Sequence, residues 1–221
     1  MSRFGEKWIN HTERMAIAWR QLVAPTDVML LPGDISWAQT TPKILPDLAW
    51  LSTLPGRKVL VRGNHDHWWD DIRKARQLCQ NFGFFALEGD SITLDDVIVC
   101  GAMGHLAPHD PYFKPDPKKD RYTRELLRLE AALQHARTAR LGTTMPILLM
   151  MHYPPFTSDG QSSGFVEVIT RYHPDVCLYG HLHHSAEWSK AKIGDHAGVR
   201  YQLVAADFLD MTPYLVWDTH A

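Results

Sequence analysis

Short, continuous apolar runs alternate along this chain with longer segments in which apolar residues recur at helical spacing. Continuous short runs are typical of buried strands, and the longer periodic pattern is typical of amphipathic helices. The pattern predicts helices over residues 6–23, 42–53, 68–82, 121–140 and 161–172. It predicts strands over residues 27–31, 57–62, 84–87, 91–94, 97–101, 146–151, 175–179, 199–205 and 214–217.

Strands that alternate with helices indicate a layered α/β domain, and the run of strands after residue 84 predicts a second sheet. A polar segment over residues 105–120 is rich in Pro, Asp and Lys and is predicted to be a loop. The chain has 221 residues, a length that suits one domain. It contains no internal repeat and no interdomain linker, so we expect a single domain over residues 1–221.

Composition and charge narrow the class of protein. The formal net charge is −2, with 45% hydrophobic and 22% charged residues, which is ordinary for a globular protein and gives no general attraction to long nucleic acid or anionic membranes. No apolar run approaches the ~18 residues of a membrane span. Cys79, Cys100 and Cys177 form no Cys-x-x-Cys pair, which argues against a zinc ribbon or a disulfide framework. The first residues lack the apolar core of a signal peptide, and we expect a cytoplasmic protein of undetermined oligomeric state.

Four of the predicted strands end in a side chain that can bind a metal. The runs before Asp34, Asn64 and His152 are apolar, and the run over residues 175–179 leads into His181 and His183. If the strand ends converge, a carboxylate, an amide and three imidazoles meet in one place. Such a mixed oxygen and nitrogen set suits Mn, Fe or Zn in an open site better than a closed structural zinc.

Each of these residues also has an ordinary structural interpretation. Asp34 follows Pro-Gly and could be a turn residue or a helix cap. Asn64 could be a turn asparagine, and His152 could be a buried, hydrogen-bonded histidine at the end of an apolar strand. One motif alone would favour these interpretations, whereas four motifs in order favour a metal centre.

The order and spacing of Gly33-Asp34, Gly63-Asn64-His65-Asp66, His152 and Gly180-His181-Leu182-His183 resemble those of the calcineurin-like metallophosphoesterases. Phe4-Gly5-Glu6-Lys7-Trp8 and the segment from Pro32 to Trp37 resemble a bacterial subgroup of predicted phosphohydrolases within that family. The resemblance covers nearly the whole chain. It implies a layered α/β/β/α sandwich and metal-dependent hydrolysis of phosphoester bonds in a small phosphorylated substrate.

The resemblance also implies a role for each residue. Asp34 would bridge two divalent cations (Mn, Fe or Zn); Asn64, His152 and His181 would complete the shell of one, and His183 would bind the other. A metal-bound hydroxide would attack phosphorus. His65 would stabilise the phosphate and protonate the leaving oxygen, and Asp66 would orient the His65 ring.

The chain departs from the family in one respect: it lacks a first strand that ends in Asp-x-His and contributes ligands to the second cation. One explanation is that the sequence starts downstream of that strand, which leaves an N-terminally shortened domain. A second is a protein that binds one cation and hydrolyses little. A third is that the apolar run over residues 214–217, followed by Asp218-Thr219-His220, supplies the strand and its ligands.

Two other functions stay open. One is a phosphodiesterase or nuclease that acts on nucleotides, although the lack of a broad basic stripe argues against long nucleic acid. The other is a metal-binding pseudoenzyme with a regulatory role, which the absent Asp-x-His motif supports.

Overall fold

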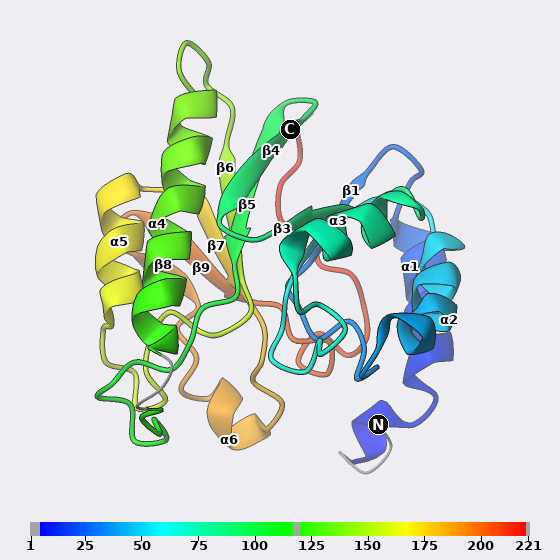
Figure 1. Cartoon of the computed structure of the whole chain (residues 1–221), viewed down its shortest axis with the longest axis horizontal. Helices are drawn as coiled ribbons and strands as arrows, with labels where there is room; N and C mark the ends of the chain where they lie inside the picture. Colours follow the sequence, from blue (N-terminus) through cyan, green and yellow to red (C-terminus); the bar gives the residue numbers. More distant parts are fainter. Residues whose placement is uncertain (1–4, 117–119, 220–221) are drawn as a thin grey trace.

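Two β-sheets pack face to face between layers of helices in the computed structural model (Figure 1). The structure describes residues 5–116 and 120–219. Phe4 and His220 of the sequence motifs lie outside the described residues. The smaller sheet is parallel, in the order β1-β2-β3, and consists of β1 (Val28–Leu31), β2 (Arg57–Val61) and β3 (Phe85–Leu87).

The larger sheet has six strands in the order β4-β5-β6-β7-β9-β8. The strands are β4 (Asp90–Leu94), β5 (Val97–Ala102), β6 (Ile147–Met151), β7 (Val176–Tyr179), β8 (Gly194–His196) and β9 (Val199–Leu203). The central strands β5, β6, β7 and β9 are parallel, and the β4–β5 and β8–β9 pairs are antiparallel. Because β1, β2, β6 and β7 all belong to parallel sets, their carboxyl ends can present side chains at one edge of each sheet.

Helices cover the outer face of each sheet, and side chains of the two inner faces pack together. Side chains alternate between the two faces along β2: Leu60 packs toward the helices, whereas Val59 and Val61 pack between the sheets. In β5, Val99 likewise faces the space between the sheets and Cys100 faces the helices. The predicted α/β/β/α layering is thus confirmed.

The helices fall into two groups. The smaller sheet is flanked by the 3₁₀ turn η2 (Glu6–Trp8) and by α1 (His11–Leu22), α2 (Thr41–Ser52) and α3 (Ile72–Gln80). The larger sheet packs against α4 (Arg121–Ala139) and α5 (Gly164–Tyr172), and the short α6 (Ser185–Trp188) follows β7. Helix α3 begins four residues later than predicted because the Asp71 carboxylate accepts the backbone N–H groups of Arg73 and Lys74 and caps it there.

The strand predicted over residues 214–217 is wrong. These residues pair with no strand in the part of the chain that the structure describes. Their apolar character is used in packing instead, since Val216 lies against the cluster between the sheets and its carbonyl oxygen accepts a hydrogen bond from Arg200.

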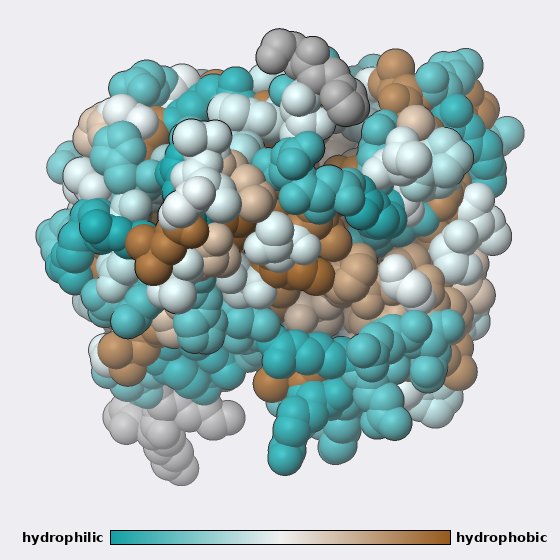
Figure 2. All heavy atoms as spheres, turned by 90° about the horizontal axis from the view of Figure 1, so that it is seen from above, coloured by the Kyte–Doolittle hydropathy of each residue, from teal (hydrophilic) through white to brown (hydrophobic). Residues whose placement is uncertain are grey.

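No helix among the described residues is long and apolar enough to cross a membrane. Figure 2 shows one face of the molecule, on which hydrophilic side chains surround smaller apolar patches. Cys79, Cys100 and Cys177 are free and buried, and the pKa of each thiol is raised mainly by burial.

Candidate metal centre

Four of the five sequence-predicted ligands converge where the two sheets meet. Asp34 follows β1, Asn64 follows β2, His152 follows β6 and His181 follows β7. His152 Nε2 lies 2.7 Å from Asn64 Oδ1, 3.1 Å from His181 Nδ1 and 3.6 Å from Asp34 Oδ1. His181 Nδ1 lies 3.0 Å from Asn64 Oδ1. Donor atoms from two sheets and four loops therefore surround one point.

Glycine makes this convergence possible. A Cβ atom added to Gly63 would lie 2.1 Å from Asp34 Oδ1, and one added to Gly33 would lie 2.7 Å from His152 Nδ1. Asp34 and His181 themselves adopt left-handed backbone angles, with φ of 56° and 70°. Such conformations cost about 1–3 kcal/mol each and cluster at functional sites. The local backbone is thus strained in order to bring these side chains together.

The protonation of His152 follows from its surroundings. Its Nδ1 lies 2.9 Å from the carbonyl oxygen of Pro32, which can only accept a hydrogen bond, so Nδ1 carries the proton. Burial lowers the pKa of His152 to about 3, and it lowers the pKa of His181 to about 3 as well. Both rings are therefore neutral near neutral pH, and Nε2 of His152 directs a lone pair toward Asn64. A neutral imidazole is the form that binds metals.

Asp66 has a different role from the one predicted. Its carboxylate is fully buried, and its Oδ2 accepts the backbone N–H groups of Asp34 and Gly63, both at 2.8 Å. Its Oδ1 accepts the backbone N–H of Ser36 and the indole N–H of Trp68. Both oxygens are thus engaged by groups other than the His65 ring, which Asp66 does not orient. Asp66 instead joins the loops after β1 and β2.

His65 lies at the edge of the cluster. Its backbone N–H donates to Asp34 Oδ1 at 2.9 Å. Its ring is stacked on the indole of Trp37, with the ring centroids 4.5 Å apart and the planes at 25°. Trp37 is 40% exposed, so this pair borders solvent. The stacking fixes the ring plane of His65, a contact that the sequence did not predict.

His183 stands apart from the other four. Its Nδ1 lies 3.1 Å from Oδ1 of Asp207, a carboxylate that is almost completely buried. Within the described chain no ion pair joins His183 to Asp34. Burial lowers the pKa of His183, but the hydrogen bond and negative charge of Asp207 outweigh burial, and the net shift is upward.

Asp207 is the buried acid that the sequence prediction missed. A signal for it exists, because Asp207 follows the predicted strand over residues 199–205 just as Asp34 follows its own strand. The observed strand β9 ends at Leu203, so three residues separate it from Asp207, and the direction of this side chain could not be predicted from the pattern.

The described part of the tail after β9 is anchored away from this site. Arg200, which donates to the Val216 carbonyl oxygen, pairs with Val176 at the beginning of β7. His181 lies beyond the other end of that strand. The segment around Val216 is therefore held beside the amino end of β7, at the opposite end of that strand from the donors. The position of Val216 argues against the third explanation, in which Asp218 and His220 supply the missing ligands, and His220 itself lies outside the described residues.

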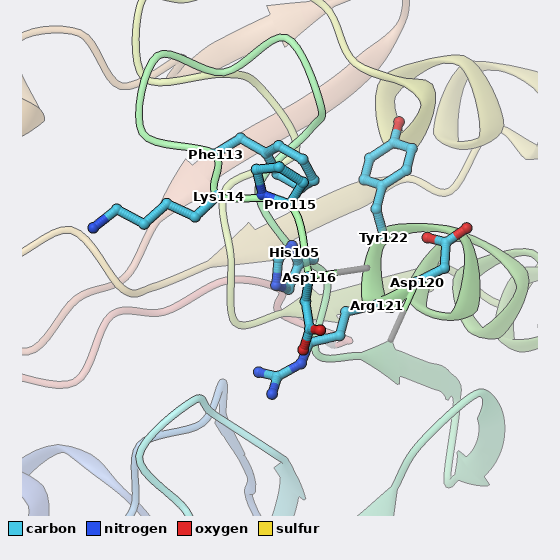
Figure 3. A pocket seen from close by; sticks show the side chains of 8 residues that line it. All are labelled: His105, Phe113, Lys114, Pro115, Asp116, Asp120, Arg121 and Tyr122. Carbon is cyan, nitrogen blue, oxygen red and sulfur yellow. The ribbon is translucent and has the colours of Figure 1, made fainter. Parts of the chain in front are cut away.

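Figure 3 shows the residues that line a cavity of about 560 Å³. The cavity is lined by residues of the loop before α4 and of the first turn of α4: His105, Phe113, Lys114, Pro115, Asp116, Asp120, Arg121 and Tyr122. The His105 ring lies 5.7 Å from the ring of Tyr153, which in turn lies 4.2 Å from the ring of His181. Tyr153 thus separates the cavity from the converging donors.

In the described part of the chain, no three His, Cys, Asp or Glu side chains are already arranged as a metal site. The cluster depends on the Asn64 amide as its fourth donor, and its donor atoms are in direct contact. In a shell with bonds of about 2.1 Å, ligand atoms lie about 3 Å apart, which is close to the separations seen here. The donor set is therefore compatible in chemistry and spacing with a small divalent cation.

Comparison with known proteins agrees with this picture. The family model described as calcineurin-like phosphoesterase matches residues 9–185. The Gene 66 protein of Mycobacterium phage L5 is 34% identical over 122 residues, which cover 53% of this chain and 58% of that protein. The Gene 66 protein of Mycobacterium phage D29 is 31% identical over 145 residues, covering 62% of this chain and 72% of that protein. The match thus spans less than two thirds of the L5 relative.

Among solved structures, the protein of unknown function AQ665 from Aquifex aeolicus matches 92% of this chain and 80% of its own. The sequence identity is 15% and the TM-score is 0.44, so the likeness is weak.

Proposed function

The chain belongs to the calcineurin-like phosphoesterase family, and from that premise we propose that it hydrolyses phosphoester bonds in a small substrate. Members of this family generally use divalent metals. The residues that would hold a cation here are Asp34, Asn64, His152 and His181. The activity is that of a phosphoric ester hydrolase.

One observation carries the proposal. His152 directs an unprotonated Nε2 at the Asn64 oxygen from 2.7 Å, while its other nitrogen is engaged by Pro32. His181 Nδ1 lies 3.0 Å from the same oxygen and 3.1 Å from His152 Nε2, and Asp34 Oδ1 lies 3.6 Å from that nitrogen, so four metal-binding side chains meet at one point. A buried arrangement of this kind is costly without a ligand, because desolvated polar groups need partners. A divalent cation would satisfy all four donors at once.

The chain's own residues account for the remaining steps. A cation bound by this set would act as a Lewis acid toward the phosphoryl group and would lower the pKa of a bound water. His65, held by its backbone bond to Asp34 and by stacking on Trp37, would give a proton to the leaving oxygen. Asp66 would keep the loops of Asp34 and Asn64 at a fixed distance.

A second cation is part of the proposal. Asp34 would be shared between the two cations, and His183 would contribute to the second, as in a dinuclear centre. Mn, Fe and Zn all suit these donors, and manganese is the first to test because carboxylate and amide oxygens favour it. If the second site is too poor in ligands, the chain would bind a single cation.

The cavity beside Tyr153 supports a small phosphorylated substrate. Lys114 and Arg121 line it and would contact an anionic group directly, although Asp116 and Asp120 line it too and balance their charge. A nucleotide fits the same description, so phosphodiesterase activity is the alternative within the same chemistry. The three buried free thiols fit the reducing cytoplasm, which we propose as the compartment.

The test combines metal binding and a substrate panel. Protein stripped with EDTA is titrated with Mn²⁺ by calorimetry and assayed on phosphomonoesters, phosphodiesters and nucleotides. The Asn64→Ala variant should bind Mn²⁺ at least ~10-fold more weakly and lose turnover, because one of four donors is removed. His135→Ala is the control, since His135 is an exposed histidine of α4, outside the cluster.

Three outcomes separate the hypotheses. Hydrolysis that depends on Mn²⁺ and on Asn64 supports the hydrolase. Tight Mn²⁺ binding without turnover of any substrate favours the pseudoenzyme. Equal Mn²⁺ binding by the wild type and the Asn64→Ala variant would remove the basis of the proposal.

A further inference from the structure

Asp207 and His183 form a pair that the proposed chemistry does not yet use. Oδ1 of Asp207 lies 3.1 Å from Nδ1 of His183. The Asp207 side chain is 2% exposed, whereas that of His183 is 32% exposed. The carboxylate thus approaches the imidazole from the protein interior and leaves the other side of the ring toward solvent.

The backbone holds Asp207 in this place by several contacts. The Phe208 N–H donates to Asp207 Oδ1, and Lys7 Nζ donates to the Asp207 carbonyl oxygen at 3.1 Å. The Val204 N–H donates to the carbonyl oxygen of Tyr179, the last residue of β7. The segment after β9 is therefore fixed beside the strand end from which His181 and His183 project, and it runs on toward the smaller sheet in Figure 1.

The Trp8 ring closes a further side of the pair. Its centroid lies 5.6 Å from that of the His183 ring, at an interplanar angle of 70°. Trp8 is 7% exposed. An aromatic edge and a buried carboxylate thus limit the rotation of this one imidazole, although His183 is not buried as deeply as His152.

We propose that Asp207 is a positioning residue that holds the proton of His183 on Nδ1 and so presents Nε2 to the second cation. The inference rests on the proposed function and names a residue that tunes the same site. A carboxylate that accepts one ring N–H fixes the tautomer and makes the other nitrogen a better ligand. In this scheme Asp207 acts through the His183 ring, since its Oδ1 accepts from the backbone N–H of Phe208 and from His183.

The first test needs no metal and no activity. ¹⁵N spectra of the histidine rings are recorded on EDTA-treated protein at alkaline pH, where neutral imidazoles dominate, and His183 is assigned with the His183→Gln variant. The wild type should carry the proton on Nδ1, and the Asp207→Ala variant should shift it to Nε2. Asp207→Asn should keep it on Nδ1, because an amide oxygen also accepts.

The second test is Mn²⁺ binding by the same proteins. Loss of the carboxylate in Asp207→Ala should weaken the weaker Mn²⁺ site by about 10–100-fold and leave the tighter site unchanged. Asp210→Asn is the matched control: Asp210 lies three residues on, its side chain is 74% exposed, and it pairs with Arg14.

The outcomes are separable from failure of the hydrolase itself. A wild-type His183 with its proton on Nε2 would overturn the inference, and so would an Asp207→Ala variant that binds Mn²⁺ like Asp210→Asn. If the Ala variant does not fold, the wild-type spectrum and the Asn variant still decide. If Mn²⁺ binds normally but no phosphoester is cleaved, the proposed function fails while the assignment of Asp207 stands.

Discussion

The carboxylate of Asp66 accepts the backbone N–H of Asp34 at 2.8 Å, and Oδ1 of Asp34 in turn accepts the backbone N–H of His65 at 2.9 Å. Two loops that are about thirty residues apart in sequence are thereby fastened by reciprocal carboxylate bonds. Hydrogen bonds to a charged group contribute about 1.5–3 kcal/mol each, so these two bonds hold the loops after β1 and β2 at a fixed separation.

Replacement of Asp66 is expected to destabilise the protein strongly. In Asp66→Asn an NH₂ group faces backbone donors that previously met an oxygen, which leaves at least one buried donor unsatisfied. We expect a loss of about 3 kcal/mol in the free energy of unfolding, measured by urea denaturation in EDTA. Asp70→Asn is the control because Asp70 is exposed, and it should change stability by less than about 0.5 kcal/mol. Equal stability of the two variants would refute the bracing role of Asp66.

Gly63 is expected to tolerate no side chain. The Cβ of a Gly63→Ala variant would lie 2.1 Å from Asp34 Oδ1 and 2.2 Å from the Asp34 backbone nitrogen. Asp34 must move, so Mn²⁺ affinity should fall at least ~10-fold. Gly83→Ala is the comparison, since Gly83 has a φ of +73° but nothing within 4 Å of the added atom. It should cost about 1 kcal/mol of backbone strain and leave Mn²⁺ binding intact.

Sequence patterns predicted the strand ends of this site well for a physical reason. An apolar run that ends in a polar residue is a local signal, and β1, β2, β6 and β7 each carry it. Because neighbouring parallel strands end at the same edge of a sheet, their terminal polar residues lie close together. The family resemblance added the roles of individual residues, and these stay predictions for His65 and for the metal ligands.

What the sequence did not predict depends on long-range contacts. Strand β8 is short and exposed, so it has no hydrophobic signal, and α6 is a single turn. The apolar run over residues 214–217 predicts a strand. Val216 is instead packed against the cluster between the sheets without backbone pairing to a neighbouring strand. The partners of Asp66 and of Asp207 depend on where a carboxylate points, and no spacing rule encodes that direction.

The metal-free protein is expected to lose stability in mild acid. The pKa values of His152 and His181 are lowered by burial to about 3, against about 6.5 in an unfolded chain. Between these values the unfolded chain binds protons that the folded chain does not, so stability is full above about pH 6.5 and falls toward pH 3. Asp66 has the opposite effect on stability. Burial raises its pKa to about 6, so between about pH 4 and pH 6 the folded chain binds a proton that the unfolded chain does not.

The net expectation is a loss of about 2 kcal/mol between about pH 7 and pH 5, since His152 and His181 outweigh Asp66 and His183, whose raised pKa values act against them. Urea denaturation in EDTA at several pH values measures it. In the His152→Gln/His181→Gln double variant, the free energy of unfolding should not decrease between pH 7 and pH 5. A double variant with the same pH dependence as the wild type would show that these rings are not the buried neutral groups inferred here.

His65 is expected to serve turnover and not metal binding. Its backbone N–H, which contacts Asp34, survives any side-chain change. His65→Ala should therefore bind Mn²⁺ as the wild type does, while kcat falls by about 10²–10⁴-fold because a proton donor is lost. His135→Ala, which changes an exposed histidine of α4, should leave kcat unchanged. Loss of Mn²⁺ binding in His65→Ala would assign the ring to the metal instead.

Trp37 is expected to set the ring orientation of His65 from outside the metal cluster. The two rings are stacked at 4.5 Å and 25°, and an aromatic pair contributes about 0.5–1.5 kcal/mol beyond its buried area. If that energy holds His65 in its productive orientation, Trp37→Ala should lower kcat by about 2–10-fold without changing Mn²⁺ affinity. Trp37→Phe keeps a stacking ring and should recover most of the loss. A Phe variant as slow as the Ala variant would mean that the indole acts through a contact other than stacking, and an Ala variant with full kcat would mean that His65 needs no such support.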